Sequence, residues 1–216
     1  MKREAIFEFF RRLAEDNPDP QTELEYSNAY QLVVAVALSA QATDISVNLA
    51  TRPLFAEIET PDQMLALGEE ALRERIKTIG LFNTKAKNVI ALSRMLVEEF
   101  SGEVPPTREE LVRLPGVGRK TANVVLNCWF GQETFAVDTH IFRVGNRTGL
   151  APGKTPDEVE AKLEKRVPRP FRLGAHHWLI LHGRYTCKAR LPECWRCPVV
   201  DLCEYRQKVL EKPARK

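Results

Sequence analysis

Four cysteines near the C-terminus constrain the fold of this chain more than any other feature of its sequence. They are Cys187, Cys194, Cys197 and Cys203, spaced C-x6-C-x2-C-x5-C with no histidine among them. Four thiolates this close in sequence can wrap one metal centre. The segment 187–203 is therefore expected to close on itself as one compact loop.

The composition predicts a soluble, intracellular protein with one large domain or two small ones. Of its 216 residues, 44% are hydrophobic, which is enough for a packed core without disulfides. The N-terminus lacks the apolar stretch of a secretory signal, and the longest apolar run, residues 32–38, is too short to span a bilayer. In a reducing compartment, clustered cysteines bind metals, whereas the isolated Cys128 is expected to be a small buried hydrophobe. The net charge of +3 permits nucleic-acid binding without arguing for it.

Hydrophobic spacing predicts a chain that is nearly all helix. Apolar residues recur at helical spacing in residues 83–100, with Lys85, Lys87 and Arg94 among the polar positions. Strand-like alternation is scarce. The best candidate strand is the valine-rich segment 31–40, but its length and its alanines favour a buried helix.

A glycine hairpin separates two predicted helices in residues 107–130. Pro115 is expected to end the first helix, and Gly116 and Gly118 can adopt backbone angles that other residues resist. The apolar face of the second helix is expected to comprise Ala122, Val125, Leu126 and Trp129. Unpaired N–H groups at the start of that helix would bind a phosphate without reading a base.

Two other interpretations of the hairpin compete with phosphate binding. A plain interhelical turn stays open, because glycine pairs are common in turns. A nucleotide P-loop is excluded, because Arg119 separates Gly118 from Lys120 and no strand precedes the loop.

The segment Leu114-Pro-Gly-Val-Gly-Arg-Lys-Thr-Ala122 resembles the helix-hairpin-helix signature of the DNA glycosylase superfamily. That signature is paired with a glycine- and proline-rich loop and an aspartate, here Asp138 in Phe135-Ala-Val-Asp-Thr-His140. The cysteines resemble the [4Fe–4S] loop of the endonuclease III branch, as do the segments 38–44 and 79–83. The resemblance extends from about residue 17 to residue 203.

The fold implied by the resemblance is all-α, with two helical lobes and a cleft between them. One lobe is a six-helix bundle over residues 22–132 that contains the helix-hairpin-helix. The other joins residues 1–21 to residues 133–211 as a four-helix iron–sulfur domain, with its cluster loop at 187–203. Residues 212–216 form a basic tail.

Lys120 and Asp138 are the residues to which the resemblance gives catalytic roles. A neutral lysine amine is a nucleophile for a sugar carbon and can form a Schiff base. A helix N-terminus and partial burial both favour that neutral form. Asp138 is expected to accept a proton and to stabilise positive charge on the sugar. From the residues alone, a solvated lysine and a helix N-cap are the simpler interpretations, and capping is compatible with catalysis.

A lysine at position 120 implies an enzyme of two activities, a DNA N-glycosylase and a DNA-(apurinic or apyrimidinic site) lyase. The damaged nucleotide is flipped out of the duplex, Lys120 attacks C1′, and β-elimination breaks the strand 3′ to the lesion. The implied partner is double-stranded DNA with oxidised or ring-saturated pyrimidines or abasic sites. We expect a monomer in the cytoplasm, associated with the nucleoid and not with a membrane.

The resemblance also implies a set of DNA contacts. Gln41 would fill the gap left by the flipped base, and Leu81 would be an apolar wedge, assisted by Ile79. Gln41 is expected in a loop, and Leu81 directly after a helix C-cap at Gly80. Phosphate contacts are expected from the hairpin and from the basic residues near the cysteines, namely Gly116, Val117, Gly118, Arg184, Lys188 and Arg190. A solvated basic loop is the alternative for the last three.

The cysteines suit either a structural zinc or an iron–sulfur cluster. Zinc sites usually have two close cysteine pairs, and here only Cys194 and Cys197 form one. The resemblance implies a [4Fe–4S] cluster. Nearby, His176, His177 and His182 are interpreted as packing or surface residues.

Two other functions are weighed. One is a mismatch-type adenine DNA glycosylase, but such relatives lack this lysine and usually carry a further C-terminal domain, whereas this chain ends soon after Cys203. The other is a non-catalytic helix-hairpin-helix module with a structural metal, which Lys120 and Asp138 together argue against.

Overall fold

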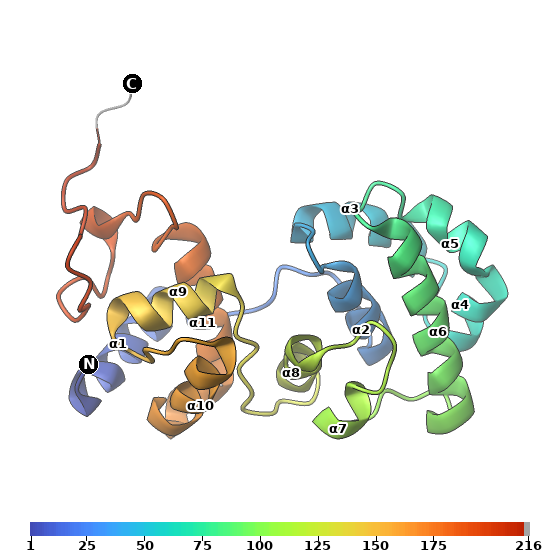
Figure 1. Ribbon diagram of the computed structural model, residues 1–216, viewed down its shortest axis with the longest axis horizontal. Coiled ribbons are helices and arrows are strands. Elements are labelled where there is room, and N and C mark those ends of the chain that lie inside the picture. The colour runs from blue at the N-terminus through green and yellow to red at the C-terminus, as the bar shows by residue number, and fades with distance from the viewer. Residues whose placement is uncertain (214–216) are drawn as a thin grey trace. The chain divides into compact units, whose positions relative to one another are not determined.

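The chain folds into helices and loops, which gather into two compact units (Figure 1). The computed structural model describes residues 1–213, and no strand occurs among them. The all-α prediction is therefore confirmed. None of the described helices is both long and apolar enough to cross a bilayer.

One unit, called here the bundle unit, is Thr22–Gln132. It contains seven helices where six were expected, because one of them is a single turn. They are α2 (Ala29–Leu38), α3 (Asp44–Phe55), α4 (Pro61–Leu67), α5 (Glu69–Arg75), α6 (Phe82–Phe100), α7 (Arg108–Leu111) and α8 (Arg119–Cys128).

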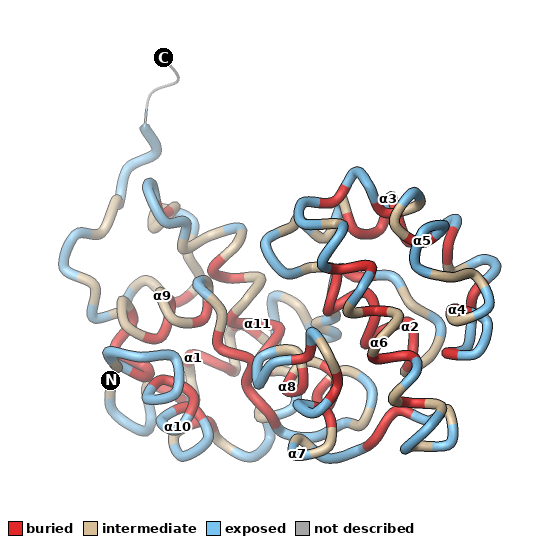
Figure 2. The backbone as a smooth tube through the Cα atoms, turned by 45° about the vertical axis from the view of Figure 1, so that its right-hand side comes forward, coloured by how far each residue is buried: buried red, intermediate tan, exposed pale blue. Residues whose placement is uncertain are grey.

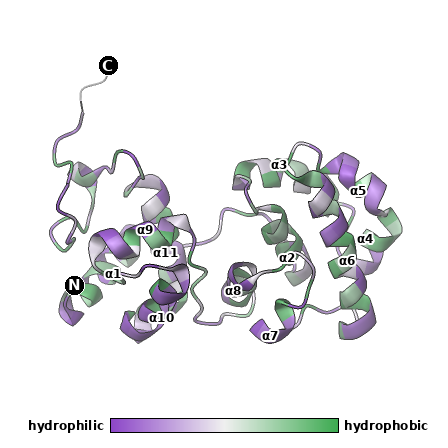
Figure 3. Cartoon of the chain, viewed as in Figure 1, coloured by the Kyte–Doolittle hydropathy of each residue, from purple (hydrophilic) through white to green (hydrophobic). Residues whose placement is uncertain are grey.

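The centre of the bundle unit is α2, which contacts α3, α6 and α8. It is apolar on every side, so it can be stable only where other helices surround it. Figure 2 shows it as buried along almost its whole length, and Figure 3 shows it as hydrophobic. Its one buried polar side chain, Gln31, donates to the carbonyls of Phe55 and Ile58 and so satisfies the end of α3. The valine-rich segment is thus a helix, as predicted.

The other unit, called here the cysteine unit, combines Met1–Gln21 with the residues from Glu133 onward. Its elements are α1 (Arg3–Asp16), α9 (Thr139–Thr148), α10 (Pro156–Arg166), the 3₁₀ turn η1 (Arg169–Phe171), α11 (Arg172–Tyr185) and the 3₁₀ turn η2 (Cys194–Arg196). The predicted tail lies partly outside the described residues, since 214–216 are not among them.

Aromatic packing holds α1 in the cysteine unit, although more than a hundred residues separate α1 from the rest of that unit. Phe9 and Phe10 are fully buried, and the Phe10 ring lies 6.0 Å from that of Phe171. The Trp178 indole donates a hydrogen bond of 2.8 Å to the carbonyl of Asn17, just beyond the end of α1. Burying two phenylalanines stabilises this docking by several kcal/mol, at roughly 2 kcal/mol each.

Two positions predicted from helical spacing are wrong: one expected at the surface is buried, and one expected on an apolar face is exposed. Lys85 is only 6% exposed, because it lies on the same stripe of α6 as Val89 and Leu92. Its Nζ has no hydrogen-bond partner within residues 1–213, and burial lowers the pKa of the amine. Trp129 is 43% exposed, because α8 ends one residue before it and its ring packs on Tyr26 instead.

The three histidines of α11, predicted to be packing or surface residues, are packing residues. His176, His177 and His182 are all buried. Burial lowers the pKa of His177 and of His182 to about 4, so both rings are neutral at pH 7. Cys128 is half-buried against the core of the bundle unit, and burial raises the pKa of its thiol to about 12.

Candidate functional site

The glycine hairpin joins α7 to α8, and only one of its two glycines occupies a position that excludes a side chain. Gly116 has φ +80°, and a Cβ there would lie 3.0 Å from the side chain of Asn88. Gly118 has an ordinary φ of −91°, and a Cβ there would meet nothing within 4 Å. The expectation of special backbone angles is thus correct for Gly116 and wrong for Gly118. Nor does Pro115 end the first helix, since α7 already ends at Leu111.

The first turn of α8 is open on its outer side. No side chain among residues 1–213 caps it, and its N-cap residue is Gly118. Its first N–H groups are therefore available to an external acceptor. Val117 is 5% exposed, so its side chain anchors the hairpin in the core and only its backbone can contact a ligand.

Lys120 lies in this first turn and is exposed. The expected partial burial is therefore wrong for the chain by itself, because the second residue of an amphipathic helix points away from the buried face that starts at Ala122. Within residues 1–213 its ammonium forms no ion pair or hydrogen bond. The amine is free to meet a group that comes from outside the chain.

Asp138 caps α9, and one of its two carboxylate oxygens does all of the capping. Oδ1 accepts hydrogen bonds from the backbone N–H groups of His140 and Ile141, at 2.9 and 2.8 Å. Oδ2 accepts none from the described part of the chain. The carboxylate is thus held in one orientation, and its Oδ2 can still accept a hydrogen bond from a ligand.

Gln41 and Leu81 both have a backbone conformation that is unfavourable for residues other than glycine. They have φ of +55° and +59°, and among the described residues only Ser101 is another non-glycine with positive φ. Ser101 is the C-cap of α6, where a left-handed residue is ordinary. Gln41 and Leu81 have no such role, and both are exposed. Backbone strain of this kind costs about 1–3 kcal/mol per residue and is common at functional sites.

Two predictions about the neighbours of Leu81 are wrong. Gly80 is not a helix C-cap, because α5 ends at Arg75 and Leu81 is instead the N-cap residue of α6. Ile79 is 1% exposed and belongs to the core, so it cannot assist Leu81 at the surface.

The four cysteines line one small cavity. Within residues 1–213, no three His, Cys, Asp or Glu side chains converge on the position of a single metal ion. Four thiols around one cavity are the donor set of a structural zinc site or of an iron–sulfur cluster. Burial raises the pKa of the Cys197 thiol to about 11 and also raises that of Cys203.

Two arginines of α9 hold the cysteine loop, and neither was among the functional residues predicted from the sequence. Arg147 donates to the carbonyls of Lys188 and Ala189, both at 2.7 Å, and its guanidinium lies 4.9 Å from the Tyr205 ring centroid. Arg143 donates to the carbonyls of Cys187 and Gly183, at 2.9 and 2.7 Å. Their spacing of four residues on one helix face, after a predicted N-cap, was the available signal.

The basic residues predicted near the cysteines are in different situations. Lys188 and Arg190 are exposed, and Lys188 pairs with Glu193 at 2.6 Å. Arg184 is half-buried on α11. His182 is a further neighbour of the cavity, with its Nε2 3.8 Å from the Cys197 sulfur.

The predicted site residues belong to two different units of the chain. The cysteine unit holds the four cysteines, Asp138 and the basic loop, joined through α9. The bundle unit holds the hairpin with Lys120, and also Gln41 and Leu81.

Comparisons with known proteins agree on one family. Residues 34–169 match the HhH-GPD superfamily of base excision DNA repair proteins. The chain is 57% identical to endonuclease III of Escherichia coli strain K12 over 97% of its own length and 99% of the relative. It is 56% identical to endonuclease III of Rickettsia conorii over 95% and 98% of the two chains. A solved trapped endonuclease III–DNA covalent intermediate matches with a TM-score of 0.88 and 42% identity, covering 94% of this chain and 96% of that one.

The two hairpin glycines provide a matched pair of substitutions. Gly116→Ala forces a positive φ on alanine and presses its Cβ against Asn88, so we expect the free energy of unfolding to fall by about 1–3 kcal/mol. Gly118→Ala fits an open space at an ordinary φ, so we expect a change within about 0.5 kcal/mol. Chemical unfolding of both variants measures this. Equal losses would contradict the different roles assigned to the two glycines.

Proposed function

The chain belongs to the endonuclease III branch of the HhH-GPD superfamily of base excision DNA repair proteins, and we propose that Lys120 and Asp138 carry out its chemistry. The chain is a DNA glycosylase and abasic-site lyase. The observation that supports Lys120 is its ammonium, exposed and unpartnered in the described part of the chain, beside an uncapped helix N-terminus. The relative trapped as a covalent intermediate with DNA requires a nucleophile, which an amine in this position can supply.

The reaction starts when the amine of Lys120 attacks C1′ of the flipped nucleotide. The N–C1′ bond forms as the bond from C1′ to the base breaks, and the departing base takes up a proton. Opening of the sugar ring gives an imine between Lys120 and C1′. Loss of a C2′ proton then pushes electrons toward the 3′ C–O bond, which breaks and leaves the strand nicked 3′ to the lesion.

Asp138 supports this sequence with its uncommitted oxygen. Capping α9 through Oδ1 fixes the carboxylate, so Oδ2 keeps one direction without further ordering when DNA binds. A carboxylate so held stabilises the positive charge that develops on the sugar and accepts the proton that Lys120 must lose.

The hairpin and two loops supply the DNA contacts. The N–H groups at the start of α8 bind a phosphate, and the open space at Gly118 lets the DNA backbone approach closely. Gln41 fills the gap left by the flipped base, and Leu81 separates adjacent base steps. Lys188 and Arg190 add phosphate contacts from the cysteine loop, as does Arg184 from α11.

The substrate class is oxidised or ring-saturated pyrimidines in double-stranded DNA, together with abasic sites. The protein acts as a monomer on the nucleoid in the cytoplasm. An adenine-specific activity is not favoured, because Lys120 provides the lyase nucleophile and the relatives that match the chain are named endonuclease III.

Cys187, Cys194, Cys197 and Cys203 hold a [4Fe–4S] cluster. All four cysteines line one cavity, and only Cys194 and Cys197 form the close pair of which structural zinc sites usually have two, which supports a cluster over zinc. Such a cluster supplies electron transfer or a rigid cross-link when bound. The residues around it act structurally: Arg143 and Arg147 hold the carbonyls of the loop from α9.

The identity of the metal centre can be tested with the cysteines of this chain. We expect the purified protein to contain iron and acid-labile sulfide in equal amounts and no zinc. Cys194→Ser should lose both, whereas Cys128→Ser should keep both, because Cys128 lies in the core of the other unit. Stoichiometric zinc, or equal loss of iron in both variants, would reject the cluster proposal.

Lys120 can be tested by trapping the imine. With borohydride and a duplex that contains an abasic site, we expect a covalent protein–DNA adduct. Lys120→Ala should abolish it, because no other amine replaces the nucleophile. Adduct formation is measured by denaturing electrophoresis, with Lys87→Ala as the control because Lys87 is an exposed lysine on α6. An undiminished adduct in Lys120→Ala would remove the nucleophile assignment.

Asp138→Asn separates capping from catalysis. Asparagine caps helices about as well as aspartate, so we expect unfolding stability to stay within about 0.5 kcal/mol. The loss of the charged oxygen should slow base removal by roughly 10²-fold to 10⁴-fold. Single-turnover base release and thermal unfolding measure the two effects. Base release at the unmodified rate would show that Asp138 is only a cap.

A further inference from the structure

A basic groove lies in the cysteine unit, along the start of α1 and the segment 165–172 that links α10 to α11. It has about 1450 Å³ of atom-free space, part of it open to solvent. None of the residues proposed for catalysis or DNA contact lines it, and none of the cysteines does.

The charge of the groove has one sign. Five basic residues line it and no acidic residue does, in a chain whose net charge is only +3. They are Arg3, Lys165, Arg166, Arg169 and Arg172. The groove therefore concentrates positive charge far above the average of the chain.

Two of the five cations are committed to the fold. Arg166 donates to the carbonyls of Met1 and Gly149, and so ties the N-terminus to the end of α9. Arg172 donates to the carbonyl of Val167 and pairs with Glu133. These contacts within the fold account for the presence of both arginines.

The other three cations have no such role. Arg3, Lys165 and Arg169 are exposed, and within residues 1–213 they form no ion pair and no side-chain hydrogen bond. Glu4 and Glu164, their nearest acidic neighbours in sequence, do not line the groove. Three uncompensated cations around one hollow are expected to attract an anionic partner.

The floor of the groove is apolar and firmly supported. Phe7 is 46% exposed there, with its ring 5.1 Å from that of Phe171. Phe171 in turn packs against Phe10 and Trp178 in the core of the unit. An exposed aromatic ring held rigidly from behind is a preformed place for an apolar side chain.

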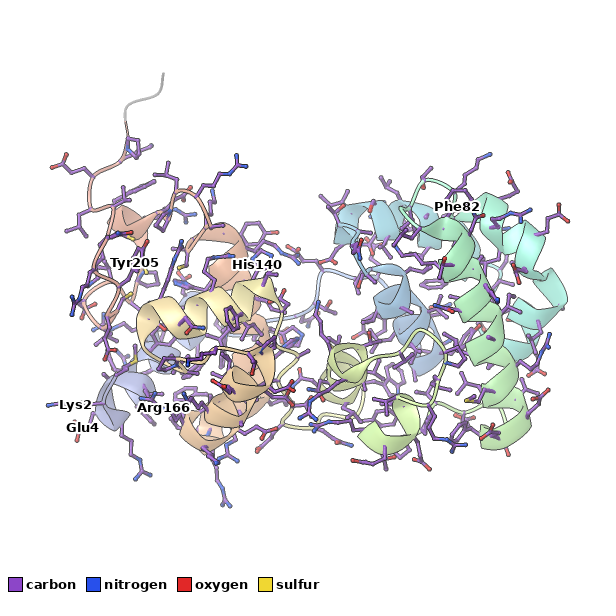
Figure 4. The ribbon with its side chains drawn as sticks, in the orientation of Figure 1. Lys2, Glu4, Phe82, His140, Arg166 and Tyr205 are labelled. Carbon is purple, nitrogen blue, oxygen red and sulfur yellow. The ribbon has the colours of Figure 1, made fainter. Side chains whose placement is uncertain are left out.

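The groove is apart from the residues of this unit that are proposed to meet DNA. In Figure 4, Lys2, Glu4 and Arg166 lie together at one corner, away from His140 near the start of α9 and from Tyr205 beside the cysteine loop. The groove and the residues of this unit that are proposed to meet DNA thus lie at different places on its surface.

We propose that the groove docks an acidic segment of a partner protein that carries an aromatic or aliphatic anchor. Carboxylates of the segment bind Arg3, Lys165 and Arg169, and the anchor packs on Phe7. A nucleic acid fits less well, because phosphates would contact the cations but nothing in a duplex backbone would fill an apolar floor. The proposal does not depend on the catalytic roles of Lys120 and Asp138.

Two fluorescein-labelled probes test the proposal on the full chain. One is a synthetic peptide in which glutamate pairs alternate with phenylalanines, and the other is an undamaged DNA duplex. The test variant is Lys165→Glu with Arg169→Glu. We expect it to bind the peptide about tenfold or more weakly, since two attractive contacts become repulsive, while duplex binding stays unchanged.

The control variant is Arg94→Glu with Lys154→Glu, which changes the net charge equally through exposed residues outside the groove. It should bind the peptide like the unmodified protein. A peptide with serine in place of phenylalanine should also bind weakly, as should the variant Phe7→Ser. Thermal unfolding verifies that each variant is folded.

Three outcomes would overturn the proposal. The first is no saturable binding of the peptide to the unmodified protein. The second is equal loss of peptide binding in the test and control variants, which would mean attraction by overall charge. The third is a loss of duplex binding in the test variant as large as its loss of peptide binding, which would make the groove a second nucleic-acid surface.

Discussion

The cap of α9 is the interaction on which the rest of the cysteine unit depends. Asp138 holds the first turn of the helix with one oxygen, and Arg143 and Arg147 hold the cysteine loop from its later turns. A ten-residue helix of this kind is stable only when its ends and its buried face are both satisfied. The carboxylate proposed to act in catalysis and the cysteine loop are thus both held by one helix.

The loop residues of the bundle unit differ in whether contacts within the chain explain their identity and backbone conformation. Gly116 is explained within the chain, because its positive φ and its contact with Asn88 exclude a side chain. Gly118, Gln41 and Leu81 are not explained in this way. The first has open space around it, and the other two hold unfavourable backbone angles at exposed positions. Unfavourable angles at exposed positions, as at Gln41 and Leu81, are common at functional sites.

Sequence reasoning recovered the features that depend on local chemistry. The helices follow from spacing, and the cap at Asp138 follows from an aspartate before an apolar-periodic segment. It failed where tertiary contacts decide. Lys85 is buried because α6 is covered on that side, and the Arg143 and Arg147 contacts join residues about forty positions apart. Spacing along a chain does not show which carbonyls a long side chain will reach.

The chain has two kinds of positive surface, the hairpin and the basic groove, although its net charge is small. At the hairpin the positive potential comes from backbone N–H groups at a helix end, which suit a phosphate that approaches closely and carries no apolar group. In the basic groove it comes from side chains around an exposed aromatic ring, which suit a flexible anion with an apolar side chain. The net charge of +3 does not reveal the presence of either surface. The distinction lies in what surrounds each positive charge, and for that reason the two surfaces are expected to select different partners.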